Sequence, residues 1–266
     1  MFGFKQRKRR RLRETPLGDH QRALLRECIP YRDLLDAAQR AELEGLVQVF
    51  LAEKSFEGCG GQAIDDEIRI TIAGHACLLL LGRDTDIYPL LSSVLVYPDG
   101  YSAPVQRHGP DGTVSEDAEE RIGESWAEGS VVISWRDVLD DLEAPEDGYS
   151  VIVHEFAHQL DDEMGEGEGV PRLPEPADYG SWRTVMQAAY GRLCADTDAG
   201  RPTLIDGYGS ESPCEFFSVI SECFFTIPVD LAEQHPELYT QLMALYRQDP
   251  ATSLRRLVDQ ESKPSR

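Results

Sequence analysis

Two histidines and a glutamate in one short stretch have the types and the spacing that bind and use a metal ion. The stretch VIVHEFAHQLDDE spans residues 151–163 and contains the pattern H-E-x-x-H, formed by His154, Glu155 and His158. Successive residues of an α-helix turn by about 100°, so a helix here would place both imidazoles on one face. The opposite side would be apolar, with Ile152, Val153, Phe156 and Leu160. A pattern this short also arises by chance, so the rest of the chain has to supply further evidence.

A catalytic zinc site takes three protein ligands and leaves one position for water, so one ligand must lie outside this stretch. No other histidine continues the motif at the spacing of longer histidine-based zinc patterns; the others are His20, His75, His108 and His235. The stretch SPCEFFSVISECFF at 212–225 offers Glu215 and Glu222 in a strongly apolar helical sequence, where an unpaired carboxylate is costly. We predict that Glu215 is the third ligand. A structural salt bridge, or a charge favoured at the start of a helix, is the alternative.

Four acidic or phenolic side chains have roles that this chemistry requires. Glu155 would act as general base, taking a proton from the attacking water and passing it to the leaving amine. Asp161 would accept a hydrogen bond from the far nitrogen of a ligand imidazole, or else cap the helix end. Glu222 would hold a ligand histidine or a neighbouring loop, or else form an ion pair in the core. Tyr208, in a glycine-flanked turn, would donate a hydrogen bond to the oxyanion, or else serve in packing.

Composition indicates a soluble globular protein with an acidic body. The 266 residues are 41% hydrophobic, which is enough for a sizeable core, and the net charge of −22 argues against a nucleic-acid partner. The longest apolar run, ACLLLLG at 76–82, is far shorter than the roughly 20 residues of a membrane span, so we expect no integral membrane segment. Six scattered cysteines without a C-x-x-C pair, and a basic N-terminus without an apolar signal region, favour the cytoplasm.

The chain is expected to form one structural unit of the α+β class, with several recognisable parts. Residues 1–18 are expected to be a basic disordered leader, with contacts to acidic lipids, RNA or the acidic body as the alternative. Residues 19–148 would supply helices and a small mixed sheet, and residues 149–252 the helical zinc-binding part. Residues 253–266 would be a polar tail.

Within these parts, the pattern of residues predicts individual elements. Strands are expected at 93–98 and 129–135, followed by a helix, and residues 99–128 are expected to form turns or a hairpin with an acidic loop. The Gly- and Pro-rich span 164–180 is expected to be a long loop that is mobile or covers the cleft. Helices are predicted at 181–196, 213–225 and 229–247. Two or three more are predicted within 19–55, where Pro30 breaks the run and the next helix starts near Asp36 or Ala37.

Three segments of the catalytic half carry a family resemblance. HEFAHQLD at 154–161, IDGYGS at 205–210 and PCEFFSVISECFF at 213–225 resemble the Mlc titration factor A family of bacterial zinc peptidases. The earlier segments LVQVFLAEKSFEGCGG, LLLLGRD, SVLVYP and GESW…SVVISW are also similar, so the likeness covers most of residues 20–250. The motifs of the core, Tyr-x6-Glu included, are further similar to the metalloprotease domain of anthrax lethal factor.

The resemblance implies a zincin-like fold with an HExxH active-site helix. It implies one catalytic Zn²⁺ bound by His154, His158 and Glu215, with Glu155 catalytic and Tyr208 assisting the transition state. It also implies a hydrolase that cleaves peptide or protein substrates, with aminopeptidase-like activity.

Two further expectations follow from this family. One member binds the glucose repressor Mlc, so the alternative function is a zinc-dependent binding protein that sequesters a transcriptional regulator, with hydrolysis incidental. In zincins an edge strand beside the active helix often pairs with the substrate backbone. We expect SVVISW at 130–135 to be that strand, with a fully interior strand as the alternative.

Overall fold

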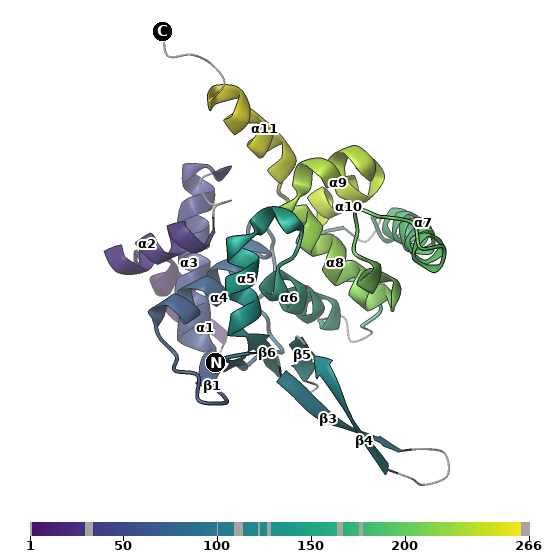
Figure 1. Ribbon diagram of the computed structural model, residues 1–266. Coiled ribbons are helices and arrows are strands. Elements are labelled where there is room, and N and C mark those ends of the chain that lie inside the picture. Colours follow the sequence, from purple (N-terminus) through teal and green to yellow (C-terminus); the bar gives the residue numbers. More distant parts are fainter. Residues whose placement is uncertain are drawn as a thin grey trace.

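The chain folds into helices around a small sheet, as the computed structural model in Figure 1 shows. The structure describes residues 2–29, 34–99, 101–108, 114–121, 123–126, 129–163, 167–175 and 178–261. Within these ranges, buried apolar side chains from Leu17 to Ala251 form one continuous cluster. The expected mixture of helices with a small sheet is therefore confirmed.

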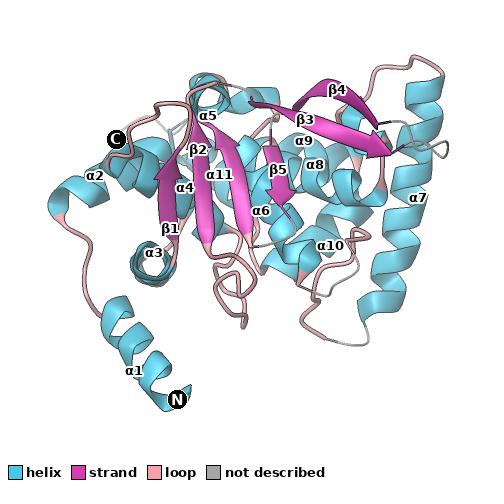
Figure 2. Cartoon of the chain, turned by 90° about the horizontal axis from the view of Figure 1, so that it is seen from below, coloured by secondary structure: helices cyan, strands magenta, loops and turns pink. Residues whose placement is uncertain are grey.

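The main sheet has four strands in the order β1, β2, β6, β5 (Figure 2). Their bounds are β1 (Ser55–Gly58), β2 (Ser93–Tyr97), β5 (Gly123–Trp126) and β6 (Ser130–Ser134). β1, β2 and β6 are parallel, whereas β5 runs antiparallel to β6. The two central strands place fully buried residues opposite each other, Val94 beside Val131 and Val96 beside Ile133. The strands expected at 93–98 and 129–135 are thus confirmed, and the structure places them at the centre of the sheet.

The expectation that residues 130–135 form an exposed edge strand is wrong. β6 lies between β2 and β5, so both of its edges are paired within the described sheet. The strand at that edge is β5, which lies beside helix α6 (Val151–Asp162). The sequence pattern did not reveal β5 because its residues, GESW, include glycine and glutamate, which are depleted in strands.

A separate hairpin confirms one of the two structures expected between residues 99 and 128. β3 (Tyr101–His108) pairs antiparallel with β4 (Val114–Arg121), and the two strands project from the body as an arm (Figure 1). The acidic loop expected in this region falls partly on residues 109–113, which lie outside the described residues.

The helices of the N-terminal half begin at identifiable caps. They are α2 (Asp19–Cys28), α3 (Ala37–Glu53), α4 (Asp66–Leu78) and α5 (Trp135–Glu143). The Asp36 side chain accepts hydrogen bonds from the amides of Ala38 and Gln39, which confirms the helix start predicted there. The β-branched run IRITI lies in α4, because Ile68, Ile70 and Ile72 are all at most 2% exposed and burial outweighs strand propensity.

The basic N-terminal segment is helical in the structure rather than disordered, so this expectation is wrong. Helix α1 (Phe2–Arg13) packs against α3. Arg9 explains the docking, because its guanidinium makes two hydrogen bonds to Glu53, at 2.7 and 2.6 Å, and also pairs with Asp86. Gly45 permits the close approach, since a Cβ there would lie 3.2 Å from the Cα of Arg13. The alternative contact with the acidic body is the one observed.

Helices make up most of the C-terminal half, and four α-helices as well as one 3₁₀ helix begin at a proline. They are α7 (Tyr179–Asp198), α8 (Pro213–Thr226), α9 (Pro228–Gln234), α10 (Pro236–Tyr246) and α11 (Pro250–Glu261), with the short 3₁₀ helices η2 (Pro145–Asp147) and η4 (Gly207–Ser210). Proline suits a first helical turn but not a helix interior. For this reason Pro236 divides the helix expected at 229–247 into α9 and α10.

A polar tail was expected at 253–266. This prediction is wrong for residues 253–261, because they belong to helix α11. Ala251 is 1% exposed, and Arg255 forms an ion pair with Glu233 of α9 at 2.9 Å. Among the helices that the structure describes, none combines the length and the apolar character needed to cross a membrane.

The motif helix α6 buries its apolar side in the core, as predicted. The four residues predicted for this side are each at most 2% exposed: Ile152, Val153, Phe156 and Leu160. The Phe156 ring lies 4.9 Å from the ring of Tyr88 and 5.8 Å from that of Phe50, measured between centroids. This packing fixes how α6 is rotated about its axis.

Residues 167–175 of the expected long loop contain no helix or strand and are tied to their surroundings, whereas Tyr179 and Gly180 already belong to α7. The indole nitrogen of Trp182 donates to the Gly169 carbonyl oxygen at 3.2 Å. Gly169 also lies directly against the start of α8, since a Cβ there would come 2.3 Å from the carbonyl oxygen of Pro213. Its φ of +74° is a further reason for glycine at this position.

Replacing Gly169 by alanine is therefore expected to lower the free energy of unfolding by about 3 kcal/mol, from backbone strain and overpacking together. Gly200→Ala is the matched control, because its φ of +64° is similar and nothing lies within 4 Å of the added Cβ. The control should lose only about 1 kcal/mol. Urea unfolding measures both values, and equal losses would contradict the close packing of this loop on α8.

Candidate functional site

Helix α6 begins at a set of hydrogen bonds that fix its first turn. Ser150 is the N-cap, and its hydroxyl accepts a hydrogen bond from the amide of Val153. The amide of Val151 donates to the carboxylate of Asp141 at 2.7 Å, and the amide of Ser150 donates to Glu222 at 2.7 Å. Two carboxylates thus satisfy amides at the positive end of the helix dipole.

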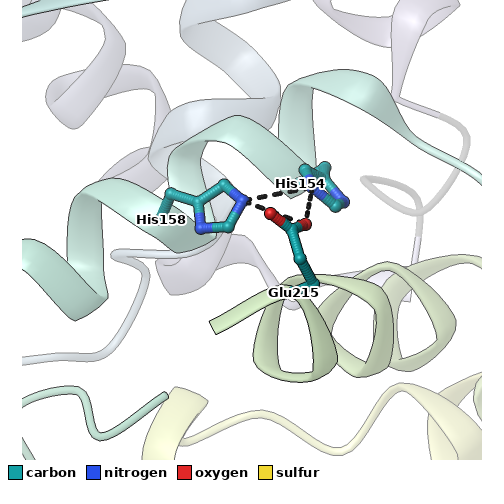
Figure 3. Close-up of side chains that lie close together, drawn as sticks. All are labelled: His154, His158 and Glu215. Carbon is teal, nitrogen blue, oxygen red and sulfur yellow. Dashed lines mark hydrogen bonds and ion pairs between the residues drawn. The ribbon is translucent and has the colours of Figure 1, made fainter. Parts of the chain in front are cut away.

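Helix α8 packs directly against α6 and brings Glu215 to the histidines (Figure 3). Ser212 is its N-cap and accepts a hydrogen bond from the Glu215 amide at 3.1 Å. The Glu215 side chain extends toward the two imidazoles of α6. The alternative of a simple helix-start charge does not account for these contacts.

The three predicted metal ligands converge on one point. Nε2 of His154 lies 3.0 Å from Oε2 of Glu215, Nε2 of His158 lies 3.4 Å from the same oxygen, and the two Nε2 atoms are 3.2 Å apart. Among the described residues, these three form the group of histidine, cysteine and acidic side chains that could hold a metal ion. Two imidazoles and one carboxylate are a donor set that divalent transition metals favour. The residues therefore fit a metal ion.

Glu222 holds His154 from the opposite side of the ring. Its Oε1 lies 2.8 Å from Nδ1 of His154, and its other oxygen accepts the Ser150 amide. This arrangement agrees with the predicted hold on a ligand histidine. With Nδ1 carrying the hydrogen and donating it to Glu222, Nε2 is left as the ligand atom. Glu215 and Glu222 are seven residues apart, which is close to two helical turns, so both reach the same imidazole from α8.

The charges around His154 favour its protonated form while no metal is bound. Burial alone would lower the pKa of His154, but hydrogen bonds to Glu215 and Glu222 outweigh it and raise the pKa to about 10. Burial would likewise raise the pKa of Glu215, but hydrogen bonds from His154 and His158 lower it to about 2. A proton on His154 thus partly neutralises the acidic site.

His158 has a different partner, which the sequence reasoning missed. Its Nδ1 lies 3.0 Å from Sγ of Cys214, in the first turn of α8. Burial raises the pKa of the Cys214 thiol, which keeps it uncharged. A thiol is a weaker hydrogen-bond acceptor than a carboxylate, so the two ligand imidazoles are held unequally. No sequence pattern marked Cys214, because only the packing of α8 on α6 brings it to His158.

The predicted contact between Asp161 and a ligand imidazole is not present. The Asp161 carboxylate accepts hydrogen bonds from the amides of Gly169 and Val170, each at 2.7 Å, and is 1% exposed. Both oxygens of the carboxylate are therefore hydrogen-bonded to the loop that follows α6. Asp161 lies one turn beyond His158 on α6, but the returning loop supplies two backbone amides to its carboxylate, and Nδ1 of His158 faces Cys214 instead.

Glu155 is buried beside the ligands and has a carboxylate oxygen without a hydrogen-bond partner among the described residues. It is 3% exposed, and the oxygen in question is Oε2. Burial raises the pKa of Glu155 to about 6, although the charges of the neighbouring imidazoles oppose this. An unpaired carboxylate oxygen in a buried position is costly unless the site uses it.

Tyr208 lies at the edge of the site. Its ring centroid is 6.0 Å from that of His154, and 48% of the residue is exposed. It belongs to η4, whose N-cap Asp206 accepts a hydrogen bond from the Tyr208 amide at 2.7 Å. The sequence reasoning did not single out Asp206, although the Asp-Gly pair in IDGYGS is a turn signal that could have identified it.

Comparison with known proteins gives a consistent result over most of the chain. The sequence model of the family described as glucose-regulated metallo-peptidase M90 matches residues 4–247. An uncharacterized protein of Synechocystis sp. is 40% identical over 245 residues, which cover 91% of this chain and 88% of that protein. Mlc titration factor A of Salmonella agona is 31% identical over 231 residues, 86% of each chain. Mlc titration factor A of Salmonella arizonae is 30% identical, covering 86% of this chain and 91% of the relative.

The unequal partners of the two histidines give a prediction for metal affinity. Glu222→Gln should weaken the binding of added Zn²⁺ about 10- to 100-fold, because His154 loses a charged acceptor. Cys214→Ala is the comparison, and it should weaken binding well under about tenfold, because a thiol contributes little as an acceptor. Competition with a chelator measures both affinities, and thermal unfolding checks that each variant is folded. An equal loss of Zn²⁺ affinity in the two variants would contradict the inference that Glu222 holds His154 more strongly than Cys214 holds His158.

Metal uptake is expected to release a proton at pH 7. The pKa of His154 is about 10 without metal, so this imidazole is protonated at pH 7 and must lose a proton before Nε2 can act as a ligand. Affinity should therefore rise as pH increases from 6 to 9. Calorimetric Zn²⁺ titrations in buffers of different ionisation enthalpy count the protons. Glu222→Gln should release fewer protons, whereas release of none from the wild type would rule out a protonated His154.

Proposed function

The chain belongs to the glucose-regulated metallo-peptidase M90 family, which includes the Mlc titration factor A proteins. From this premise we propose that it is a zincin-like, zinc-dependent metallopeptidase that hydrolyses peptide bonds with an activated water. One observation carries the proposal: three ligand atoms converge beside the buried carboxylate of Glu155, which has an unpaired oxygen. A structural metal site would not need such a base.

His154, His158 and Glu215 would hold the ion. Two imidazoles and one carboxylate are a donor set that zinc favours. Three protein ligands leave the fourth coordination position open for water or substrate. When bound, Zn²⁺ supplies a Lewis acid that makes water a better nucleophile and polarises the scissile carbonyl. Glu222 orients His154 for this task through Nδ1, and Cys214 does the same for His158.

Glu155 would move the proton. Its carboxylate accepts a proton from the attacking water and then delivers it to the nitrogen of the leaving amine. Burial has already raised its pKa to about 6, which places it nearer to neutral pH than an exposed glutamate. The unpaired Oε2 gives the carboxylate an oxygen that is available for this proton.

Tyr208 would stabilise the negative charge that develops on the carbonyl oxygen. Its ring lies beside that of His154, and its position at the edge of the site suits a hydrogen-bond donor to the substrate. With 48% of the residue exposed, the Tyr208 side chain is accessible to a bound substrate.

The substrate is proposed to be a peptide or protein, cleaved with aminopeptidase-like activity. The resemblance to the Mlc titration factor A family supports this detail. A cytoplasmic location is proposed because the six cysteines are free thiols in the structure, which suits a reducing compartment.

The name of the relatives from Salmonella favours a second candidate function. They are called Mlc titration factor A, a name that refers to the titration of Mlc. In this chain the metal site would then organise a surface that binds a transcriptional regulator, with hydrolysis incidental. Purified Mlc-type repressor mixed with wild type and with a variant inactive in hydrolysis distinguishes the two functions, because capture alone would survive the loss of turnover.

Glu155→Gln is expected to retain stoichiometric zinc and thermal stability but to lower kcat at least about 1000-fold, because the proton acceptor is removed. Elemental analysis measures the zinc, and turnover is followed on a peptide with a free N-terminus and on its N-acetylated form. Asp162→Asn, a change of a partly exposed acid near the end of the same helix, is the control and should keep kcat within about twofold. A Glu155→Gln variant with unchanged turnover would contradict the proposed mechanism.

A further inference from the structure

One carboxylate connects the start of the motif helix to the turn that carries Tyr208. Oδ2 of Asp206 accepts a hydrogen bond from the Tyr149 hydroxyl at 2.6 Å, and Oδ1 accepts one from the Tyr208 amide at 2.7 Å. Tyr149 and Asp206 are 57 residues apart in the sequence. We call this pair, Tyr149 and Asp206, the tyrosine-aspartate clasp.

The clasp connects two elements that meet at the metal ligands. Tyr149 directly precedes Ser150, the N-cap of α6, and one turn later the helix presents His154. Asp206 is the N-cap of η4, which carries Tyr208 near the His154 ring. The clasp therefore joins the start of α6, which positions His154, to the start of η4, which positions the Tyr208 phenol.

The end of η4 beyond Tyr208 is held by contacts that do not involve Asp206. Gly209 is buried against α8, where an added Cβ would lie 3.5 Å from the Cα of Phe216. The Tyr190 hydroxyl donates to the Ser210 carbonyl oxygen at 3.1 Å. These contacts fix the far end of the turn to α7 and α8. At the other end, Asp206 links η4 to the residue that precedes the N-cap of α6.

We propose that Tyr149 and Asp206 are positioning residues that set the Tyr208 hydroxyl against the oxygen where negative charge develops. This inference rests on the proposed peptidase function. A donor placed before the reaction begins needs no reorganisation as charge develops, which is why its position affects kcat rather than substrate binding. Asp206 raises the pKa of Tyr149 to about 12, so the Tyr149 hydroxyl remains a donor at working pH.

The test removes one hydroxyl from the clasp. Tyr149→Phe should lower kcat about tenfold with KM within about twofold, because Tyr208 becomes less well placed. Asp206→Asn should act in the same direction but more weakly, since the amide oxygen can still accept from the Tyr208 amide while an N–H group replaces the oxygen that accepts from Tyr149. The probe is a chromogenic aminoacyl anilide together with a short peptide. Zinc content and thermal stability should not change in Tyr149→Phe.

A double-mutant cycle shows whether the effect passes through Tyr208. In a Tyr208→Phe background, which itself should cost about 100-fold in kcat, Tyr149→Phe should cause no further loss. A merely structural role would lower kcat by the same factor in both backgrounds, and that result would overturn the proposal. Tyr190→Phe is the matched control, because it removes a hydroxyl bonded to the same turn without touching Asp206, and it should leave kcat within about twofold.

Amide hydrogen exchange supplies a measurement that does not depend on turnover. Tyr149→Phe should speed exchange at the Tyr208 amide and leave residues 154–158 unchanged. If the wild type hydrolyses neither probe while this loosening is observed, the peptidase function fails and the structural link stands. If the wild type is active but Tyr149→Phe changes neither kcat nor exchange, the clasp proposal is wrong and the peptidase function stands.

Discussion

The buried carboxylate of Glu222 is the interaction on which the site depends. It is 5% exposed, and it accepts hydrogen bonds from both the Nδ1 side of His154 and the amide of Ser150. A buried anion is tolerated only when such partners satisfy it, so α8 cannot shift along α6 without leaving the charge unpaired. Because Glu215 lies two turns earlier on the same helix, the bond that holds His154 also sets where the third ligand lies.

The hydrogen-bonding partners of the two histidines differ in charge, and this shapes how the site behaves. His154 lies between two carboxylates and binds a proton strongly when no metal is present. His158 faces an uncharged thiol. A cation and a proton therefore compete at the His154 imidazole, and the negative charge that attracts the metal is the same charge that retains the proton.

Local patterns predicted the parts of the structure whose causes are local. The apolar side of α6, the helix start at Asp36 and the strands β2 and β6 follow from residue periodicity and caps. The errors share a different cause. Helix α1 exists because Arg9 meets Glu53 and Asp86, which are distant in sequence. β6 is interior because β5 pairs with it, and Asp161 turns to a returning loop rather than to an imidazole.

The sequence by itself determined which side chains are able to bind a metal and which face of α6 they share, because helical geometry depends only on spacing. It also indicated Glu215 as the candidate for a third ligand, from an acid in apolar surroundings. Only the tertiary structure decided which partner each of these groups has: Glu222 for His154, Cys214 for His158, and Asp206 for the turn of Tyr208. These pairings join residues that are tens of positions apart, and helix packing, which no local pattern encodes, brings them within hydrogen-bond distance.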